Sequence, residues 1–446
     1  MDCRQATGTR EPFRRRAPLS QCGNPGRHLG MENHFDVVVV GAGLAGLAAA
    51  ATTVRGGART VVLEAHRPGG RARTTQRDGF TLNLGGHALY CNGSGRRVLA
   101  DLGVEPAGSA PPLGRYTGSV DGTLHLLPTG PGSLVRSSLL GVRSKVQLGG
   151  LLARLPRMSS AELAGRSVRA WLDEVGLRPD ADALMIALIR LGTYCPDVDH
   201  FGADAALAQL QIAASGGVHY LHGGWSPLTD ALGQGTEVRS LTPVRTLEPA
   251  AGQIEVGTDE GPVIGRQVVI AAGSPAAARS LLPEPPDWGD LGGPVTAACL
   301  DLAVRRIPAP GYVLGIDAPV YATTQGPPAR QAPAGQSVVA VLRYGSRSAE
   351  LDRSELGEYR RLCGVSDDDV VFERFLASMT VAGTMPRAEA GGMRGRPTVD
   401  DSGTAGILLA GDWIGPDGLL ADAALASGHL GGRSALDALR GTRQTS

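Results

Sequence analysis

Three glycines and one glutamate near the start of the sequence have the spacing of a dinucleotide site. Gly41-Ala42-Gly43-Leu44-Ala45-Gly46 fits the pattern G-x-G-x-x-G, and Glu64 follows eighteen positions after the last glycine. The first glycine permits a tight turn, the second lets the backbone approach a pyrophosphate, and the third lets a helix pack on a strand. A carboxylate at Glu64 would bond the ribose hydroxyls of an adenosine and would repel a 2′-phosphate, which disfavours NADP. The alternative interpretation of Glu64 is an exposed glutamate at a strand end.

The residues around this motif predict the elements that would position it. Phe35 to Val40 is a short β-branched run that is typical of a buried parallel strand, Leu44 to Val54 predicts a helix, and Thr60 to Leu63 predicts a second strand. Free N–H groups at the start of that helix would hold the phosphates. Other segments predict further elements: a strand at Gln267–Ile270, a helix opened by Ser274-Pro275, a strand at Gly406–Asp412 and a helix from about Leu420 to Leu439. We therefore expect an α/β fold whose doubly wound, Rossmann-like sheet is assembled from distant parts of the chain.

Length and composition limit the classes of protein that this sequence can encode. With 446 residues, of which 42% are hydrophobic, the chain is long enough for two domains. Its 43 basic and 43 acidic residues balance, so no overall field attracts nucleic acid or an anionic membrane. Lys145 is the single lysine.

Several features of the sequence indicate in which cellular compartment the protein resides. The uncharged apolar run from Val37 ends at Thr52, Thr53 and Arg55, short of a membrane span. Residues 1–30 are rich in Arg, Pro and Gly and lack the apolar stretch of a secretory signal, so we expect a disordered extension, with Met31 as an alternative start. No C-x-x-C pair or metal-spaced His cluster occurs, which favours a reduced, cytoplasmic protein without a metal site. The six cysteines lie far apart, at Cys3, Cys22, Cys91, Cys195, Cys299 and Cys363.

Further glycine-rich motifs follow in a definite order along the chain. "HRPGGRART" spans His66 to Thr74, and "LNLGGHALY" spans Leu82 to Tyr90. "HYLHGGWSPLTDALG" begins at His219, "VVIAAGSPAAA" begins at Val268, and "LLAGDWIGPDGLLADAALASG" begins at Leu408. Together with the G-x-G-x-x-G segment, these motifs resemble the flavin monoamine oxidase and phytoene desaturase superfamily. The resemblance covers nearly everything from Asp36 to Leu439.

The resemblance implies a GR2-type FAD-binding domain, with FAD held without a covalent link because no cysteine lies near the C-terminal "GDW" motif. Gly41, Gly43 and Gly46 would line the pyrophosphate, and Glu64 would bind the adenosine ribose. The implied cofactor-binding residues are Gly41, Ala42, Gly43, Leu44, Ala45, Gly46, Glu64, Ala65, Gly70, Arg71, Gly85, Gly86, His87, Val244, Gly411, Asp412, Leu420 and Ala421.

Other members of this set have implied roles of their own. Arg71 would meet the phosphate or ribityl region, Asp412 would fix a pyrophosphate or ribityl contact, and the backbone of Val244 would hold the adenine. The start of the helix near Leu420 and Ala421 would face the pyrimidine edge of the isoalloxazine, where a helix N-terminus favours the negative charge of the reduced flavin.

The same resemblance predicts how the domains divide the chain. The FAD domain would comprise residues 34–104, 216–289 and 396–440, and a second, α+β substrate domain would comprise residues 105–215 and 290–395. The substrate segments combine Pro/Gly-rich connections, an apolar helical stretch "ADALMIALIRLG" and the strands "VTAACLDLAV" and "QSVVAVLRYG".

The sequence says less about the reacting groups. His87 would lie beside the flavin, either as a proton shuttle or, as a histidine between Gly86 and Ala88, as a structural residue. Amine oxidases of this superfamily place a lysine near flavin N5, yet residues 290–395 contain none and Lys145 lies in the earlier segment. No catalytic acid or base can be assigned from these patterns.

Three functions are compatible with this pattern. The first is an FAD-dependent oxidoreductase that desaturates, saturates or isomerises carbon–carbon bonds of a lipophilic polyene or terpenoid. The second is an amine oxidase that releases hydrogen peroxide, and the third is a flavin-binding partner protein without catalysis. We expect a small lipophilic substrate and no nucleic acid. A lipid substrate would favour peripheral membrane contact, although no basic amphipathic helix is evident.

Overall fold

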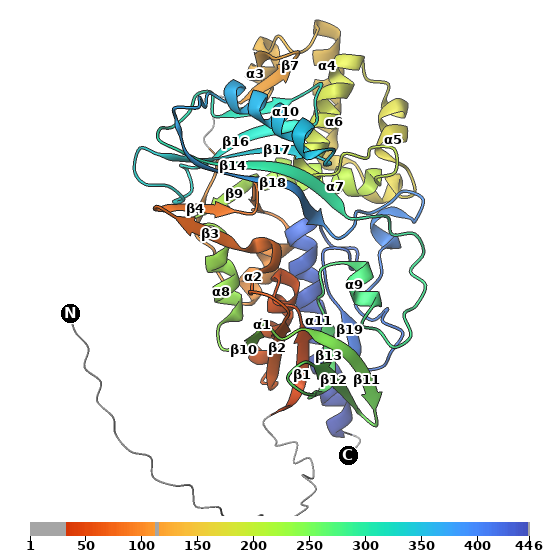
Figure 1. Cartoon of the computed structure of the whole chain (residues 1–446). Helices are drawn as coiled ribbons and strands as arrows, with labels where there is room; N and C mark the ends of the chain where they lie inside the picture. Colours follow the sequence, from red (N-terminus) through yellow and green to blue (C-terminus); the bar gives the residue numbers. More distant parts are fainter. Residues whose placement is uncertain (1–32, 112–115, 445–446) are drawn as a thin grey trace, which may run out of the picture.

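The computed structural model describes residues 33–111 and 116–444, so the expected extension at residues 1–30 and Met31 lie outside the described residues. Two large sheets organise the molecule, with the chain crossing repeatedly between them (Figure 1). We call them the platform sheet and the upper sheet. The N-terminal strand and the C-terminal helix both belong to the platform end, while a helical lobe lies beyond the upper sheet (Figure 1).

The platform sheet is a parallel core extended by two antiparallel strands. Its strand order is β10-β2-β1-β13-β12-β11, and β19 also pairs with β13. Along β1, Val37 and Val39 face one hydrophobic cluster while Val38 and Val40 face another, as expected for a strand that is covered on both faces. The strands are β1 (His34–Val40), β2 (Thr60–Glu64), β10 (Glu237–Ser240), β11 (Val244–Ala250), β12 (Gln253–Thr258), β13 (Val263–Ile270) and β19 (Ile407–Leu409).

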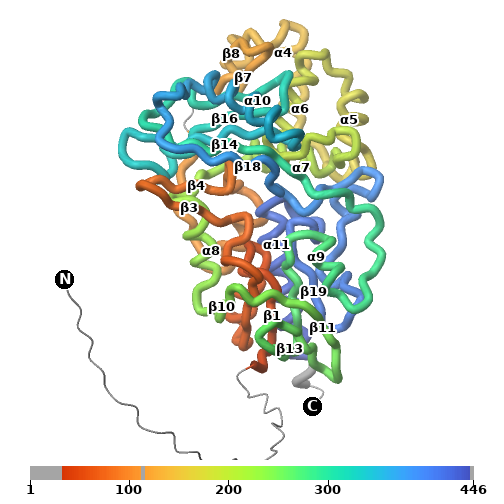
Figure 2. Tube along the Cα trace, in the orientation of Figure 1, coloured from red at the N-terminus to blue at the C-terminus, as the bar shows by residue number. Residues whose placement is uncertain are grey.

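Two helices from opposite ends of the sequence pack closely on this sheet, as Figure 2 shows for α1 (Leu44–Arg55) and α11 (Leu420–Gln444). A Cβ at Gly428 would lie 2.1 Å from the carbonyl oxygen of Ala45, and one at Gly432 would lie 2.8 Å from that of Ala49. Small residues on both helices therefore let the two backbones approach. The remaining helices at this end are α2 (Ser94–Asp101), α8 (Ser226–Gly233) and α9 (Pro275–Arg279).

The upper sheet is mostly antiparallel, and its two faces meet different partners. On β14, Ala298, Leu300 and Leu302 pack under α10 (Ala349–Leu362), whereas Cys299 faces the helical lobe. This alternation follows from the two-residue period of a strand. In sheet order the strands are β18 (Val370–Ala382), β14 (Val295–Val304), β17 (Ser337–Tyr344), β16 (Val320–Gly326), β15 (Tyr312–Gly315), β7 (Thr117–Val120) and β8 (Thr123–Leu126).

The helical lobe lies beyond the upper sheet, and small sheets join the two ends of the molecule (Figure 1). Within the described residues, no helix is both long enough and apolar enough to cross a membrane. The lobe contains α3 (Pro131–Arg136), α4 (Val142–Arg154), α5 (Val168–Val175), α6 (Pro179–Thr193), α7 (Ala203–Gly216) and the short turns η3 (Leu155–Arg157), η4 (Ser160–Leu163) and η5 (Gly392–Gly395). The joining elements are η2 (Gly70–Ala72), β3 (Thr74–Arg77), β4 (Phe80–Asn83), β5 (Leu89–Tyr90), β6 (Gly108–Ser109) and β9 (Val218–Leu221).

Most of the expected elements are present, with different ends. β13 begins at Val263 rather than Gln267, because its first half pairs with β12 before its second half pairs with β19. β19 ends at Leu409 rather than Asp412, because the N–H of Gly411 turns to donate to the Ser427 hydroxyl.

Candidate active site

The turn between β1 and α1 uses its three glycines for different reasons. Gly41 has a φ of +103°, and a Cβ there would lie 2.5 Å from the carbonyl oxygen of Ala271. A Cβ at Gly46 would lie 1.9 Å from the carbonyl oxygen of Gly41. Gly43 instead has a φ of −80°, and a Cβ there would meet nothing within 4 Å. Packing within the protein therefore explains the glycines at positions 41 and 46, and the open space at position 43 suits a bound group.

The start of α1 offers backbone donors toward that open space. Leu44 and Ala45 form its first turn, and no side chain caps the helix. Such uncapped N–H groups and the helix dipole bind phosphate. The carbonyl of Ala42 accepts the N–H of Gly69 at 2.7 Å, and a Cβ at Gly70 would lie 3.3 Å from the Cα of Gly43. The "PGGR" turn thus lies directly over the helix start.

Glu64 is nearly buried at the end of β2, rather than exposed at a strand end. Its Oε2 accepts the N–H of Ala42 at 2.7 Å, and its Oε1 accepts the N–H of His66 at 2.8 Å. Each carboxylate oxygen has a second lone pair, so the group retains acceptors for ribose hydroxyls. The next residue, Ala65, is exposed.

Arg71 and Asp412 form a bidentate ion pair, with N···O distances of 2.7 and 2.9 Å. Arg71 also donates to the carbonyl of Val381 at 2.8 Å, and Asp412 accepts the N–H of Gly383 at 3.0 Å. Burial acts to lower the pKa of Arg71, but the Asp412 carboxylate outweighs it and leaves the pKa above its ordinary value. The pair joins the turn after β2, the end of β18 and the segment after β19. Its members bind each other, and their roles toward FAD stay predictions.

The "LGGHAL" segment lies between the two sheets. A Cβ at Gly85 would lie 2.7 Å from Cε of Met379, and one at Gly86 would lie 2.4 Å from the hydroxyl of Tyr321. Nδ1 of His87 lies 3.1 Å from the carbonyl oxygen of Gly85, and Nε2 lies 3.1 Å from that of Arg71. Burial lowers the pKa of His87, so the ring is neutral near pH 7 and donates to one of the two carbonyls. These contacts favour the structural interpretation of His87.

A buried polar cluster with one carboxylate, Asp301 of β14, lies against this segment, and the sequence patterns did not single it out. Asp301 is 2% exposed, and its Oδ2 accepts from Arg374 at 2.6 Å. The backbone N–H groups of Gly85 and Gly86 lie close enough to Asp301 and Cys299, respectively, to act to lower the pKa values of these two side chains. Burial raises the pKa of Asp301, and Arg374 opposes that rise. The cluster therefore lies against the glycine pair, on the same face of the upper sheet as Tyr321 and Leu342. The only sequence signal was an aspartate within the otherwise apolar strand "VTAACLDLAV".

Tyrosines form a wall against the glycine pair, and two of them belong to the same sheet face as Cys299. The hydroxyl of Tyr194 donates to the carbonyl of Gly86 at 2.8 Å and lies 2.5 Å from the hydroxyl of Tyr321. Tyr321 stacks on Tyr344 with ring centroids 5.6 Å apart. Burial raises the pKa values of all three tyrosines, so their hydroxyls stay neutral. The spacing of these residues along the chain gave no reason to group them.

The start of α11 has an unusual backbone. Leu420 has a φ of +54°, which branched side chains rarely adopt, and Ala421 follows in the first helical turn. Asp422 turns away toward α2, where its Oδ1 accepts the N–H of Gly95 at 2.8 Å while its buried Oδ2 has no partner among the described residues. This strained start is the helix end that we expect to face the isoalloxazine.

Asp422 gives a prediction about stability. Burial raises its pKa from 3.8 to about 6. The native state therefore binds more protons than the unfolded state between these values, so the free energy of unfolding decreases as pH rises through about pH 4 to 6. The loss amounts to about 3 kcal/mol at most. Asp422→Asn retains an acceptor for Gly95 and should remove that part of the decrease, as urea unfolding at several pH values would measure. Equal pH slopes in the two proteins would contradict the assignment.

Val244 begins β11, close to the end of β2. Thr242, two residues earlier, donates its N–H to the carbonyl of Glu64 at 2.9 Å. Val244 therefore follows two residues after a backbone contact with Glu64, although β11 itself ends the platform sheet on the side opposite to β10 and β2. Its backbone contact with adenine stays a prediction.

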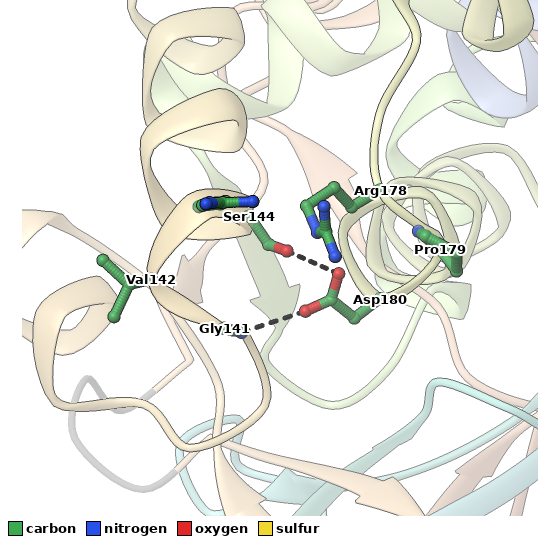
Figure 3. A pocket seen from close by; sticks show the side chains of 7 residues that line it. Gly141, Val142, Ser144, Arg178, Pro179 and Asp180 are labelled. Atoms are coloured by element: carbon green, nitrogen blue, oxygen red, sulfur yellow. Dashed lines mark hydrogen bonds between the residues drawn. The ribbon is translucent and has the colours of Figure 1, made fainter.

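The single lysine lies elsewhere. Lys145 is on α4, and its Nζ donates to the carbonyl of Val135 at 2.7 Å. A cavity of about 460 Å³ opens nearby, between the starts of α4 and α6, and is remote from the β1–α1 turn (Figures 1 and 3). There Asp180 accepts the N–H of Gly141 at 2.9 Å and the hydroxyl of Ser144 at 2.6 Å (Figure 3). Neither Lys145 nor this cavity belongs to the candidate active site.

The described residues fit FAD at the platform. Open space at Gly43, an uncapped helix start and a nearly buried carboxylate at Glu64 match the needs of a pyrophosphate and a ribose. We expect the flavin ring to extend from the pyrophosphate site toward the Gly85–Gly86 pair and the start of α11. When bound, FAD supplies a two-electron centre that accepts or donates a hydride.

This fold and site define an FAD-dependent oxidoreductase with one nucleotide platform and one covering sheet. Residues 44–298 match the family of flavin containing amine oxidoreductases, and the chain belongs to this family. The expected superfamily, the FAD cofactor and the enzymatic class are thereby confirmed.

Two curated relatives match parts of the chain. Over 191 residues it is 29% identical to coproporphyrinogen III oxidase of Propionibacterium freudenreichii subsp. freudenreichii, a match that covers 40% of this chain and 35% of that enzyme. Over 63 residues it is 38% identical to the chloroplastic prolycopene isomerase of Daucus carota, which covers 14% of this chain and 10% of the isomerase. The chain thus spans about a third or less of each relative's length.

Solved structures of other proteins resemble this fold over nearly the whole chain. Putrescine oxidase bound to putrescine superposes with a TM-score of 0.69 at 18% identity, over 91% of this chain and 99% of that one. The similarity confirms the expected α/β fold class.

Proposed function

We propose that this flavoprotein acts on carbon–carbon bonds of a lipophilic substrate, by desaturation, saturation or isomerisation of a polyene-like or terpenoid-like compound. The observation that carries the proposal is the composition of the wall over the Gly85–Gly86 pair. That wall presents neutral tyrosines, Leu342 and Met379. The only lysine of the chain lies on α4, away from it.

The charges near the glycine pair support an uncharged substrate. The carboxylate there, Asp301, is buried and already paired with Arg374. An ammonium substrate would gain no free carboxylate from this cluster, and its desolvation would cost several kcal/mol. A neutral hydrocarbon has no charge to desolvate when it packs on aromatic rings and aliphatic side chains.

The residues of this chain have a positioning role in the proposed reaction. Asp301 and Cys299 lie against the backbone of the glycine pair, and Tyr194 donates to the carbonyl of Gly86. Because neither glycine has a side chain, Met379 and the hydroxyl of Tyr321 approach this backbone closely. Buried aromatic rings around it exclude water, which protects a hydride in transfer.

The relatives differ in the substrates that their names indicate. Prolycopene isomerase points to a polyene, coproporphyrinogen III oxidase to a porphyrinogen and putrescine oxidase to an amine. An amine oxidase that works without a lysine is therefore the competing function.

Anaerobic reduction of the flavin tests the proposal. From a panel of carotenoids, terpenoids, retinoids, porphyrinogens and polyamines, we expect a carotenoid or terpenoid to react in one of three ways. Desaturation bleaches the oxidised flavin, saturation restores the visible absorbance of chemically reduced flavin, and isomerisation leaves the absorbance unchanged and gives an isomerised product. Bleaching by an amine with release of hydrogen peroxide in air would overturn the proposal in favour of amine oxidation. Bleaching by a porphyrinogen alone would also overturn it. A flavin whose redox state no compound changes, together with no product from any compound on oxidised or reduced protein, would indicate the non-catalytic partner protein.

A further inference from the structure

The helical lobe and the adjoining strand β8 together carry most of the large exposed apolar side chains among the described residues. Among the described residues, ten such side chains are exposed, and six of them belong to β8, α3 and α4. The most exposed are Val142 at 78%, Val135 at 73% and Val146 at 71%. We call this set the lobe face: Leu124, Leu126, Val135, Val142, Val146 and Leu152.

The orientation of α4 explains why these side chains stay exposed. Leu148 and Leu151 are buried on its inner side, at 0% and 1%. Asp180, in the first turn of α6, fixes the start of α4 through Gly141 and Ser144. Figure 3 shows Val142 pointing away from this contact. The helix is thus amphipathic, with a second apolar side that no other part of the described chain covers. Its Arg143, Lys145 and Arg154 also make it basic, so the expectation that no basic amphipathic helix is present was wrong.

The charge around the lobe face is of one sign. The segment 122–160 contains Arg136, Arg143, Lys145, Arg154 and Arg157 and no acidic residue, in a chain whose net charge is +0. The acids that flank this segment in the sequence are Asp121 at the tip of the β7–β8 turn and Glu162 in η4. Two further acids contact this region of the chain, because Asp317 accepts the N–H of Asp121 and Asp180 accepts the N–H of Gly141. The carboxylate of Asp180 is turned inward to the start of α4. Exposed valines and leucines between arginines match a surface that inserts apolar side chains among anionic lipid headgroups.

We propose that the lobe face, formed by β8, α3 and α4, docks this protein on an anionic lipid bilayer. The occupant is a membrane rather than a second copy of the chain, because a basic face meets its own copy with like charges whereas an anionic bilayer complements it. The inference extends the proposed function, since a lipophilic substrate resides in a bilayer and the lobe adjoins the sheet that covers the candidate active site (Figure 1).

Flotation of the FAD-loaded protein with lipid vesicles tests the docking without any substrate. We expect binding to vesicles of equal parts phosphatidylcholine and phosphatidylglycerol, and at least about tenfold weaker binding to phosphatidylcholine alone. The double variant Val142→Ser, Val146→Ser should lose about tenfold or more in affinity. Arg143→Gln with Arg154→Gln should lose about fivefold per arginine on the anionic vesicles only.

Matched controls distinguish binding through the lobe face from nonspecific binding by any exposed apolar side chain. Leu241 and Leu351 are 71% and 57% exposed outside the lobe, so Leu241→Ser with Leu351→Ser should bind as the unchanged protein does. Equal binding by both serine pairs, or no binding to either vesicle, would overturn the proposal. So would a dimer in light scattering that the Val142→Ser, Val146→Ser pair converts to monomer. The flotation assay contains no substrate, so a negative result there does not contradict the proposed reaction. Likewise, a negative result in the flavin-reduction assay does not contradict membrane docking.

Discussion

Gly43→Val should give a folded protein that has lost its flavin. A valine at this position keeps an allowed backbone, since φ is −80°, and its Cβ meets no protein atom within 4 Å. The side chain would instead fill the space in which we place the pyrophosphate. We expect FAD affinity to fall at least about a hundredfold, or about 3 kcal/mol. Visible absorbance of the purified protein and titration with FAD measure the loss, and circular dichroism checks the fold.

Gly46→Val is the matched control for this experiment. Its Cβ would lie 1.9 Å from the carbonyl oxygen of Gly41, so the protein itself cannot accept the substitution. We expect insoluble or unfolded protein, whereas Gly43→Val stays soluble. A yellow Gly43→Val protein with unchanged FAD affinity would remove the pyrophosphate from this turn.

Arg71→Ala should destabilise the whole molecule. Asp412 is 3% exposed and would keep the N–H of Gly383 but lose both hydrogen bonds to the guanidinium. Removal of one partner from a buried pair costs about 3–5 kcal/mol, because the remaining charge stays desolvated. The half-exposed Arg71 places this variant at the lower end of that range. Urea unfolding of the apoprotein measures the loss of free energy.

Arg245→Ala provides the comparison. Arg245 and Asp259 form an equally short pair, with an N···O distance of 2.8 Å, but both side chains are exposed at 61% and 59%. Its loss should leave the unfolding midpoint nearly unchanged. If both variants shift the midpoint equally, the Arg71–Asp412 pair has no special role in joining the sheets. Partial rescue is expected from Arg71→Ala combined with Asp412→Asn, because no unpaired buried charge then remains.

The local sequence determined the nucleotide platform almost completely. The turn at Gly41 and the helix from Leu44 depend mostly on neighbours within a few residues, although distant Ala271 also requires a glycine at position 41. Glu64 meets the N–H of Ala42 across 22 positions, within one strand–helix–strand unit. Backbone conformation and short-range hydrogen bonds set such geometry, so residue type and spacing suffice to predict it. The position of Glu64 is instructive, since the sequence left open an exposed side chain and the structure buries it between two backbone N–H groups.

Only the tertiary structure decided which distant residues meet. Arg71 pairs with Asp412 across 341 positions of sequence, and Asp301 reaches Gly85 because β14 passes beneath that glycine. No local pattern records which strands become neighbours, since that choice minimises the exposed apolar surface of the whole chain. The exposed valines of α4 have the same origin: helical spacing shows an apolar side, and only packing shows that Leu148 is covered while Val146 faces solvent.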